Sequence, residues 1–472
     1  MPDVLLRGGC VVDANGDRLA DVLVRGSEVS AVGKGLLAPQ GALVLDVDGC
    51  TVSPGLVDLH AHLREPGAEE SECVETGTRA AALGGYTAVV VMPNTDPPID
   101  SASMVREMHE LRSKSLVEMA VAGAITVGRR GEALAPIGEM ASLGVTIFTD
   151  DGAGVQDGGL LRAAMEYATG IGVTIAEHCE DASLAAGGAM HEGGWSSVLG
   201  LPGAPAVAEE VMVARDLALA RVAGARLHLM HLSTAGSIDL VRRARADGVQ
   251  ATAEVSPHHL SLTDEALVSY DTNLKMSPPL RSGGDVDALR AGLVDGVVDA
   301  IATDHAPHPA ESKEVPFIDA ANGVLGLETA LALALTMLAG TGAGRRAGRA
   351  PGRRSGAGAP AGDGPSGSAD RLTTYRGAAP ASRALSIREV LAVMSWNPAR
   401  IASLGNTQGG PIVPGAPANI CVFDASSSWV VDPARFASRS RNTPFGGWDL
   451  TGKVVHTICA GEPVVLYGEA QR

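Results

Sequence analysis

Short runs of hydrophobic residues recur along the chain from Pro54 onward, and longer segments with helical periodicity separate them. Each run is rich in aliphatic residues and is short enough to be a buried strand. The eight runs span residues 55–63, 87–95, 118–126, 145–151, 173–181, 226–234, 251–257 and 299–308. Strands that alternate with helices are typical of parallel βα units, so eight units predict an α/β fold, the TIM (β/α)8 barrel.

The segments between the runs place apolar residues at three- and four-residue spacing, which predicts helices that cover the outside of the barrel. Residues 209–224 and 327–338 have this pattern, and residues 386–405 predict a helix that ends at a glycine. Gly, Ala, Pro, Arg and Ser dominate much of residues 340–383. This composition predicts a disordered insertion within a barrel domain of residues 54–405, and we assign it no function.

Both ends of the chain have β character. Residues 1–53 contain short alternating strands with Gly, Asp and Asn turns, and residues 406–472 are again strand-like. Because chain ends often lie close together, we expect these two segments to form one composite β-sandwich beside the barrel.

Composition narrows the class of partner. The net charge of −17 repels polyanions, so nucleic acid is not expected to bind. The six cysteines are far apart and form no C-x-x-C pair, which favours a reducing cytoplasm over a disulfide framework. The amino-terminal residues do not have the pattern of a signal peptide, and no apolar run approaches the roughly 20 residues that cross a bilayer. We therefore expect a cytoplasmic protein without a membrane partner.

Polar residues at the ends of the predicted strands are the candidates for chemistry, because the active site of a TIM barrel forms at the carboxyl ends of its strands. His60 and His62 are two residues apart on the first strand, so both imidazoles face the same side. This H-x-H pair alone fits either a metal site or two histidines that form hydrogen bonds inside the core.

The other strands favour the metal interpretation. Histidines end the fifth and sixth strands, and aspartates end the fourth and eighth, an expensive group of polar residues unless an ion binds them. Imidazole and carboxylate ligands suit Zn²⁺, although Mn²⁺ or Co²⁺ fit the same set. Two ions would use six ligands comfortably and generate a hydroxide nucleophile, which predicts hydrolysis of an amide-like bond. These additional residues are His178, His231, Asp304 and the pair Asp150 and Asp151.

Six motifs occur in order along the chain: DLHAHLREPG, MPNTDPP, AEHCED, HLSTAGS, EVSPHHL and ATDHAPH. In these motifs the sequence resembles the bacterial dihydroorotase family of the amidohydrolase superfamily, over residues 1 to about 338 and 384–472. The resemblance implies a TIM barrel with a flanking β-sandwich. It also implies the reversible cyclisation of N-carbamoyl-L-aspartate to (S)-dihydroorotate with loss of water, a step of pyrimidine biosynthesis.

The resemblance further implies a ligand set for two Zn²⁺ ions per chain. His60, His62 and Asp304 would hold one zinc ion, His178 and His231 would hold the other, and Asp151 and a hydroxide would bridge them. Many related hydrolases bridge their ions with a carboxylated lysine, but the matching segment TIFTDDG contains no lysine. Asp304 would also act as the general acid and base, although a carboxylate that only binds metal is the alternative.

Substrate-binding residues also follow from the resemblance. His62, Arg64, Asn94 and His308 would contact the substrate, Arg64 through a guanidinium fork that suits a carboxylate. The chain departs from the family at two positions, with Ser277 where Asn is usual and Ala321 where Pro is common. These departures concern affinity more than reaction class. The backbone of Asn322 and Gly323 would also face the ligand.

Several neighbouring residues stay open. His258 and His259 favour structural roles or contacts to ligand residues, and Asp58 either orients a ligand or is a satisfied buried carboxylate. Glu177, Glu180 and Asp181, which flank His178, have no assignment.

Two other functions compete with this interpretation. One is a different cyclic amidohydrolase, such as a hydantoinase or allantoinase, and the other is a non-catalytic scaffold with the same fold. The partners expected are a small-molecule substrate and either a second copy, as a homodimer, or aspartate transcarbamoylase.

Overall fold

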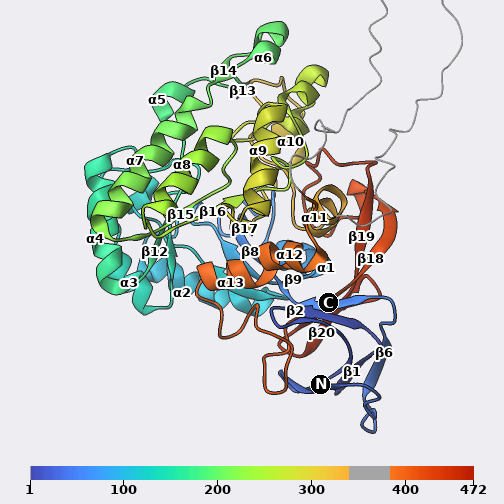
Figure 1. The fold of residues 1–472 in the computed structure, drawn as a ribbon. Helices are drawn as coiled ribbons and strands as arrows, with labels where there is room; N and C mark the ends of the chain where they lie inside the picture. Colours follow the sequence, from blue (N-terminus) through green and yellow to red (C-terminus); the bar gives the residue numbers. More distant parts are fainter. Residues whose placement is uncertain (1, 340–382) are drawn as a thin grey trace, which may run out of the picture.

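The computed structural model describes residues 2–339 and 383–472 and is shown in Figure 1. Two parallel sheets form its centre, with strand orders β10-β9-β8 and β11-β12-β15-β16-β17. Their strands are β8 (Leu56–Ala61), β9 (Tyr86–Val91), β10 (Glu118–Val121), β11 (Ile147–Phe148), β12 (Thr174–Glu177), β15 (Arg226–Leu229), β16 (Ala251–Val255) and β17 (Ala300–Ile301).

Isolated bridges connect these two sheets at both of their edges. Gly123 after β10 pairs with Phe148 of β11, and Ala61 of β8 pairs with His305 after β17. The His62 N–H also donates to the His305 carbonyl at 2.9 Å. Small and aliphatic side chains from the strands meet in one buried cluster between the sheets, and it includes Leu59, Val90, Ala122, Ile147, Ala176, Met230 and Ala300.

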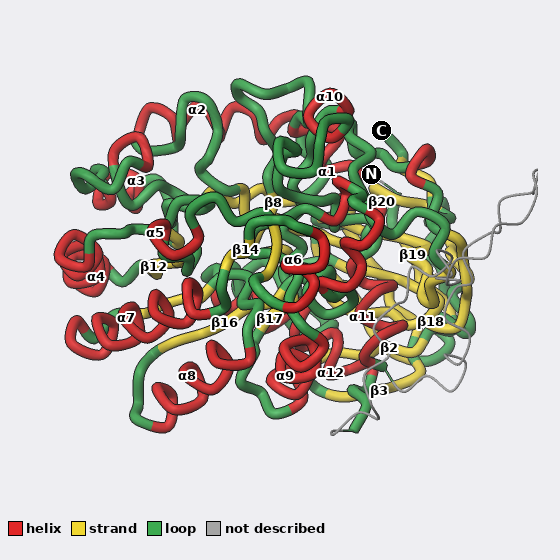
Figure 2. Tube along the Cα trace, turned by 90° about the horizontal axis from the view of Figure 1, so that it is seen from above, coloured by secondary structure: helices red, strands yellow, loops and turns green. Residues whose placement is uncertain are grey.

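Helices surround the parallel strands, as the view from above in Figure 2 shows. Their apolar faces join the largest buried cluster of the molecule, which also contains residues of the strands. The helices that follow the strands are α1 (Val74–Leu83), α2 (Ala102–Leu111), α3 (Ile137–Ser142), α4 (Gly158–Ile171), α7 (Val207–Ala223), α8 (Ala235–Ala246), α9 (Gly283–Val294) and α11 (Ala330–Leu338). Shorter helices lie in the connections, and they are α5 (Ala182–Ala185), α6 (Gly194–Leu199) and α10 (Ala310–Lys313).

The helix predicted over 209–224 is α7, which ends where Gly224 takes up a left-handed conformation with φ of 64°. The helix predicted over 386–405 is interrupted. It consists of α12 (Ile387–Leu391), a π-helical turn (Ala392–Trp396) and α13 (Asn397–Ile401). Ser386 begins it with a capping box, since its hydroxyl accepts from the Glu389 N–H.

Residues from both chain ends share one sheet, with the order β21-β20-β19-β18-β7-β2-β3, beside a four-stranded sheet β5-β4-β1-β6. β7 pairs with β18 in antiparallel fashion and with β2 in parallel fashion. Val and Ile side chains of the two sheets form one buried cluster. The amino-terminal strands are β1 (Val4–Arg7), β2 (Cys10–Asp13), β3 (Gly16–Leu19), β4 (Asp21–Arg25), β5 (Glu28–Gly33), β6 (Leu43–Asp46) and β7 (Thr51–Pro54). The carboxyl-terminal strands are β18 (Ile420–Val430), β19 (Asp449–Cys459), β20 (Glu462–Leu466) and β21 (Glu469–Ala470).

The predicted barrel strands begin near the observed ones but extend too far at their carboxyl ends. The run 299–308, for example, contains only two strand residues, Ala300–Ile301. Beyond them the backbone leaves the ladder, and Asp304 has a positive φ of 46°. The predicted insertion at 340–383 lies almost wholly outside the described residues. Within the described ranges, no helix has the length and apolar character needed to span a membrane.

Candidate metal centre

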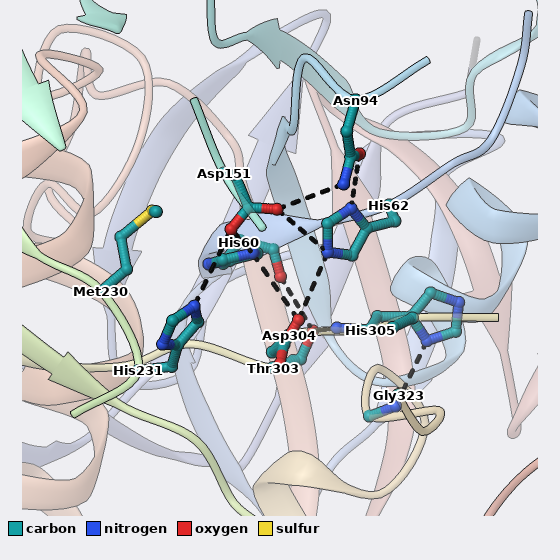
Figure 3. Close-up of polar contacts among 12 residues, drawn as sticks. His60, His62, Asn94, Asp151, Met230, His231, Thr303, Asp304, His305 and Gly323 are labelled. Carbon is teal, nitrogen blue, oxygen red and sulfur yellow. Dashed lines mark hydrogen bonds and ion pairs between the residues drawn. The ribbon is translucent and has the colours of Figure 1, made fainter. Parts of the chain in front are cut away.

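His60 and His62 lie at the carboxyl end of β8 and are both buried. Their ring centroids are 5.2 Å apart, and Figure 3 shows both rings beside the carboxylates of Asp151 and Asp304. The side chains share a face because successive side chains of a strand alternate in direction.

Asp151 lies at the centre of the cluster, three residues after β11. Its Oδ1 is 3.3 Å from His60 Nε2, and its Oδ2 is 3.6 Å from His62 Nε2. On the other side, Oδ1 lies 3.9 Å from His178 Nδ1 and 3.8 Å from His231 Nε2. Asp151 thus belongs to two groups of possible metal ligands, one with His60 and His62 and one with His178 and His231.

His178 and His231 follow two adjacent parallel strands, β12 and β15. His178 Nδ1 and His231 Nε2 are 3.0 Å apart, and both rings are buried. Burial, together with the neighbouring His231, lowers the pKa of His178 to about 3. Neutral imidazole is the form that binds metal ions.

Asp304 follows β17 and points toward the first pair of histidines. Its Oδ1 is 3.3 Å from His62 Nε2 and 3.6 Å from His60 Nε2. Burial raises the pKa of this carboxyl, but the hydrogen bond with His62 and the charges of nearby imidazoles outweigh it and hold the pKa below its usual range. Asp304 is therefore ionised at neutral pH.

The donor set fits a divalent cation. Among the described residues, the buried His60 Nε2 has no hydrogen-bond partner, although it faces both aspartates. Buried polar atoms normally have partners, so an atom left over at this point marks a ligand position. The nearby carboxylate of Asp151 raises the pKa of His60 despite the burial of the ring. Without a cation, this cluster would concentrate unpaired polar atoms in a dry interior.

Asn94, which follows β9, joins the cluster. Its Oδ1 accepts from His62 Nδ1 at 2.8 Å, and its Nδ2 donates to Asp151 Oδ2 at 3.3 Å. Arg64, two residues beyond His62, has a φ of 60° and donates from Nε to the Pro307 carbonyl at 3.3 Å. Both side chains therefore lie at the mouth end of the strands.

The remaining predicted substrate-binding residues form contacts with one another and with nearby loops. His308 Nε2 donates to the Asn322 carbonyl at 2.7 Å. Gly323 donates its N–H to the Lys275 carbonyl at 2.9 Å, and a Cβ at Gly323 would lie 3.1 Å from His308 Nε2. Ser277 donates to Glu180 at 3.4 Å. The structure brings these residues into the loops that follow β16 and β17.

A pocket of about 450 Å³ opens beside His178. Glu180 and Arg129 also line it. Arg129 donates from Nη2 to the Asp151 carbonyl in a short hydrogen bond, so this wall of the pocket is tied to the central aspartate. Arg129 is a residue that the sequence interpretation did not single out.

Three further side chains contact the candidate ligand residues or their immediate neighbours in the chain. Glu254 on β16 accepts from His60 Nδ1, and the sequence interpretation missed it. The available signal was a single glutamate within the apolar seventh run. Asp58 accepts from both the N–H and the hydroxyl of Thr303, and burial raises its pKa to about 7. His258 Nε2 lies 4.0 Å from Asp304 Oδ2.

Comparison with known proteins agrees with this geometry. Among solved structures, the chain matches L-hydantoinase from Arthrobacter aurescens with a TM-score of 0.82 and 25% identity, covering 100% of this chain and 98% of that one. It also matches dihydropyrimidinase from Brevibacillus agri with a TM-score of 0.80 and 23% identity, covering 99% and 96%. The match to L-hydantoinase, together with the two groups of possible metal ligands, indicates a cyclic amidohydrolase.

Sequence relatives make the assignment narrower. The family model described as "Dihydro-orotase-like" matches residues 49–237. The dihydroorotase of Pelotomaculum thermopropionicum is 44% identical, over 98% of both chains. The dihydroorotase of Streptomyces coelicolor is also 44% identical, over 99% of this chain and 100% of its own. The chain belongs to the dihydroorotase family.

Proposed function

We propose that the chain is a metal-dependent dihydroorotase, which interconverts N-carbamoyl-L-aspartate and (S)-dihydroorotate in pyrimidine biosynthesis. The observation that carries this proposal is Asp151 between two groups of buried histidines, in a chain 44% identical to named dihydroorotases over nearly its whole length.

The architecture behind this proposal is a closed (β/α)8 barrel over residues 54–405 and a β-sandwich from residues 1–53 and 406–472. The bridges at both edges of the two parallel sheets support closure of the barrel. The sheet that contains both β7 and β18 supports the composite sandwich. A closed barrel would bring the carboxyl ends of all eight strands to one mouth, where the ligand residues converge.

We propose two zinc ions in the centre. His60, His62 and Asp304 would hold one, His178 and His231 would hold the other, and Asp151 would bridge them. When bound, such ions supply Lewis-acid chemistry that lowers the pKa of water and polarises a carbonyl group. The donor set consists of imidazoles and carboxylates and contains no thiolate, which favours zinc over softer metals.

Asp304 is the proposed general acid and base. In ring opening, water adds to the ring amide carbonyl and the C–N bond breaks, so one proton must pass from the water to the ring nitrogen. The ionised Asp304 carboxylate accepts this proton and then donates it to the leaving nitrogen. In ring closure the same carboxyl takes a proton from the attacking nitrogen and returns it to the departing water, as microscopic reversibility requires.

The carboxylate that the ring retains is the proposed target of Arg64, Asn94 and His308. A guanidinium fork binds a carboxylate through parallel hydrogen bonds. His62 would also contact the substrate. Its ring is oriented by the hydrogen bond that its Nδ1 donates to Asn94 Oδ1 at 2.8 Å. We also assign Ser277, Asn322 and Gly323 to the substrate pocket, where the contact of Asn322 with His308 would set the position of the imidazole.

The assay that tests the function uses purified chain loaded with zinc, with N-carbamoyl-L-aspartate and dihydroorotate as the two substrates. We expect turnover in both directions, and none with hydantoin or allantoin at equal concentration. Turnover of hydantoin alone would assign the chain to a different cyclic amidohydrolase. Full metal loading without turnover of any of these compounds would identify a scaffold.

For the cellular setting, we propose a reducing cytoplasm, because none of the six cysteines forms a disulfide in the described part of the chain. For assembly, we propose a homodimer or a complex with aspartate transcarbamoylase. Light scattering on the pure chain, and then on a mixture with that enzyme, distinguishes the two.

A further inference from the structure

We infer that Glu254 is a positioning residue that fixes which nitrogen of His60 faces the metal centre and thereby sets the affinity of one ion. This inference rests on the proposed function, because it concerns the ion assigned to His60, His62 and Asp304. A chain of buried polar contacts leads from His60 away from the centre along β16.

Glu254 accepts from two imidazoles at once. Its Oε1 is 3.2 Å from His60 Nδ1, and its Oε2 is 3.0 Å from His228 Nε2. His228 Nδ1 in turn lies 2.9 Å from the hydroxyl of Thr252. Glu254 is 1% exposed and His228 2% exposed, so solvent does not compete for these contacts.

An ionised carboxylate offers only acceptors, so the His60 nitrogen that faces it must carry the hydrogen. This places the hydrogen of His60 on Nδ1 and leaves the lone pair on Nε2. Nε2 is the atom that faces Asp151 at 3.3 Å and Asp304 at 3.6 Å, and it has no hydrogen-bond partner among the described residues. A carboxylate behind a ligand histidine holds the ring in one tautomer and increases the basicity of its ligand nitrogen.

Glu254 treats the two groups of ligands differently. It contacts the side chain of His60, but it reaches His231 only through the backbone, since the His231 N–H donates to Oε1 at 3.4 Å. The effect of removing its charge should therefore concentrate on the ion at His60. A residue that merely stabilised the fold would weaken both ions alike.

Glu254→Gln tests the inference, because an amide keeps the size of the side chain but presents one acceptor and one donor. If the amide nitrogen faces His60 Nδ1, the imidazole hydrogen must move to Nε2, which can then no longer bind metal. If the amide oxygen faces His60, the tautomer survives but the negative charge is lost. Either arrangement weakens the same ion.

The measurement is the number of zinc ions bound per chain across a series of chelator-buffered free zinc concentrations. We expect Glu254→Gln to weaken one ion by about 10- to 100-fold and to leave the other within about twofold. The matched control is Glu177→Gln on strand β12, which lies in the same sheet and is separated from β16 by β15. Glu177 is equally buried, and its Oε2 accepts from the backbone N–H of Val155 at 3.0 Å, a bond that the glutamine carbonyl can replace. We expect this control to bind both ions as the wild type does.

Should Glu254→Gln fail to fold, Glu254→Asp keeps the charge and withdraws it by one methylene, and we expect it to weaken the same ion. Unchanged zinc affinity in either folded variant, or equal weakening of both ions, would overturn the inference. Failure of the proposed function is visible separately, because it would be seen in the wild-type chain as missing turnover of dihydroorotate. A wild-type chain that binds fewer than two ions would overturn the inference together with the two-ion centre.

Discussion

His60, His62 and Asp304 show how single residues at strand ends acquire chemical roles. The two histidines face one side because side chains alternate along a strand. Asp304 itself has a left-handed backbone conformation, which turns the chain after β17 and brings its carboxylate to His62. The hydrogen bond with His62 and the neighbouring imidazoles hold the pKa of Asp304 below its usual range, so its side chain is in the ionised form, the form that can accept a proton. Its two proposed roles, metal ligand and proton carrier, can be separated by substitution.

Asp304→Asn keeps an oxygen that can contact a metal ion but removes the proton acceptor. We expect kcat to fall by about 10²- to 10⁴-fold while zinc content stays within about 20% of the wild type, as befits loss of a general base. Steady-state kinetics on zinc-loaded protein, together with metal analysis of the same sample, measure both. Loss of activity in proportion to loss of zinc would reduce Asp304 to a ligand.

Arg64→Lys keeps the positive charge but removes the planar fork. We expect KM for dihydroorotate to rise about tenfold or more with a smaller change in kcat, because a lysine cannot form the parallel pair of hydrogen bonds. The matched control is Arg162→Lys on α4, whose exposed guanidinium pairs with Glu166. An unchanged KM in Arg64→Lys would remove Arg64 from the substrate pocket.

At the scale of elements, β8 and β17 are tied together directly next to the candidate metal ligands. Asp58 of β8 accepts from the Thr303 N–H at 2.8 Å and from its hydroxyl at 2.5 Å. Thr303 immediately precedes Asp304, so this contact fixes the point at which β17 ends. The same pair of strands is joined by the bridge between Ala61 and His305.

Thr303→Val removes the hydroxyl donor without changing the shape of the side chain much. We expect a loss of about 1–3 kcal/mol in the free energy of unfolding, because a buried carboxylate oxygen loses its partner. Chemical denaturation followed by circular dichroism measures the change. Thr169→Val, on the exposed face of α4, serves as control and should stay within about 0.5 kcal/mol. Equal stability of wild type and Thr303→Val would show that the Asp58 contact does not secure β17.

The sequence patterns predicted which strands and helices form better than they predicted where each one ends. The eight apolar runs start close to the observed strands, and the helix over 209–224 matches α7. The predicted runs extend too far because residues beyond each strand, such as His178 and Asp304, still lie among apolar residues after the hydrogen bonds between the strands have ended. The interruption of the helix over 386–405 by a π-helical turn was not predictable, since its period is still helical.

For the site, contacts between residues close in the sequence could be predicted, and contacts between distant residues could not. His60 and His62 could be paired from the strand period alone, because the contact is local. Glu254 could not be assigned to His60, because the two are 194 residues apart and only the packing of β8 against β16 in the folded chain brings them together. The composition of β3 did not predict a strand for a related reason, since its sequence GDRL is polar and becomes a strand by pairing with β2.

At the scale of the whole molecule, Glu328 connects the segment before α11 to the carboxyl-terminal segment. It precedes α11, and its Oε1 accepts from the N–H of Ala437 at 2.9 Å and of Ser438 at 3.3 Å. Burial raises the pKa of this carboxyl to about 8, from an ordinary value of 4.5. The folded chain therefore holds a proton there that the unfolded chain releases.

This difference gives a pH-dependent contribution to stability. Between pH 4.5 and about 8 the folded state binds more protons at Glu328 than the unfolded state, so its contribution falls as pH rises through that window and is constant above it. Glu328→Gln removes the titration and keeps a carbonyl acceptor. We expect the variant to gain about 3 kcal/mol relative to the wild type between pH 5 and pH 8. Thermal unfolding of both proteins at these pH values measures the change. A difference in stability between wild type and variant that is the same at pH 5 and pH 8 would contradict the expectation.

The pairing of β7 with β18 brings together Ser53 and Cys421, which are 368 residues apart in the sequence. During synthesis the ribosome therefore releases the amino-terminal strands long before their neighbours exist. The sheet can be completed only after nearly the entire chain has been translated. A product of premature termination would carry an unpaired β7 edge, which is a ready target for chaperones and proteases.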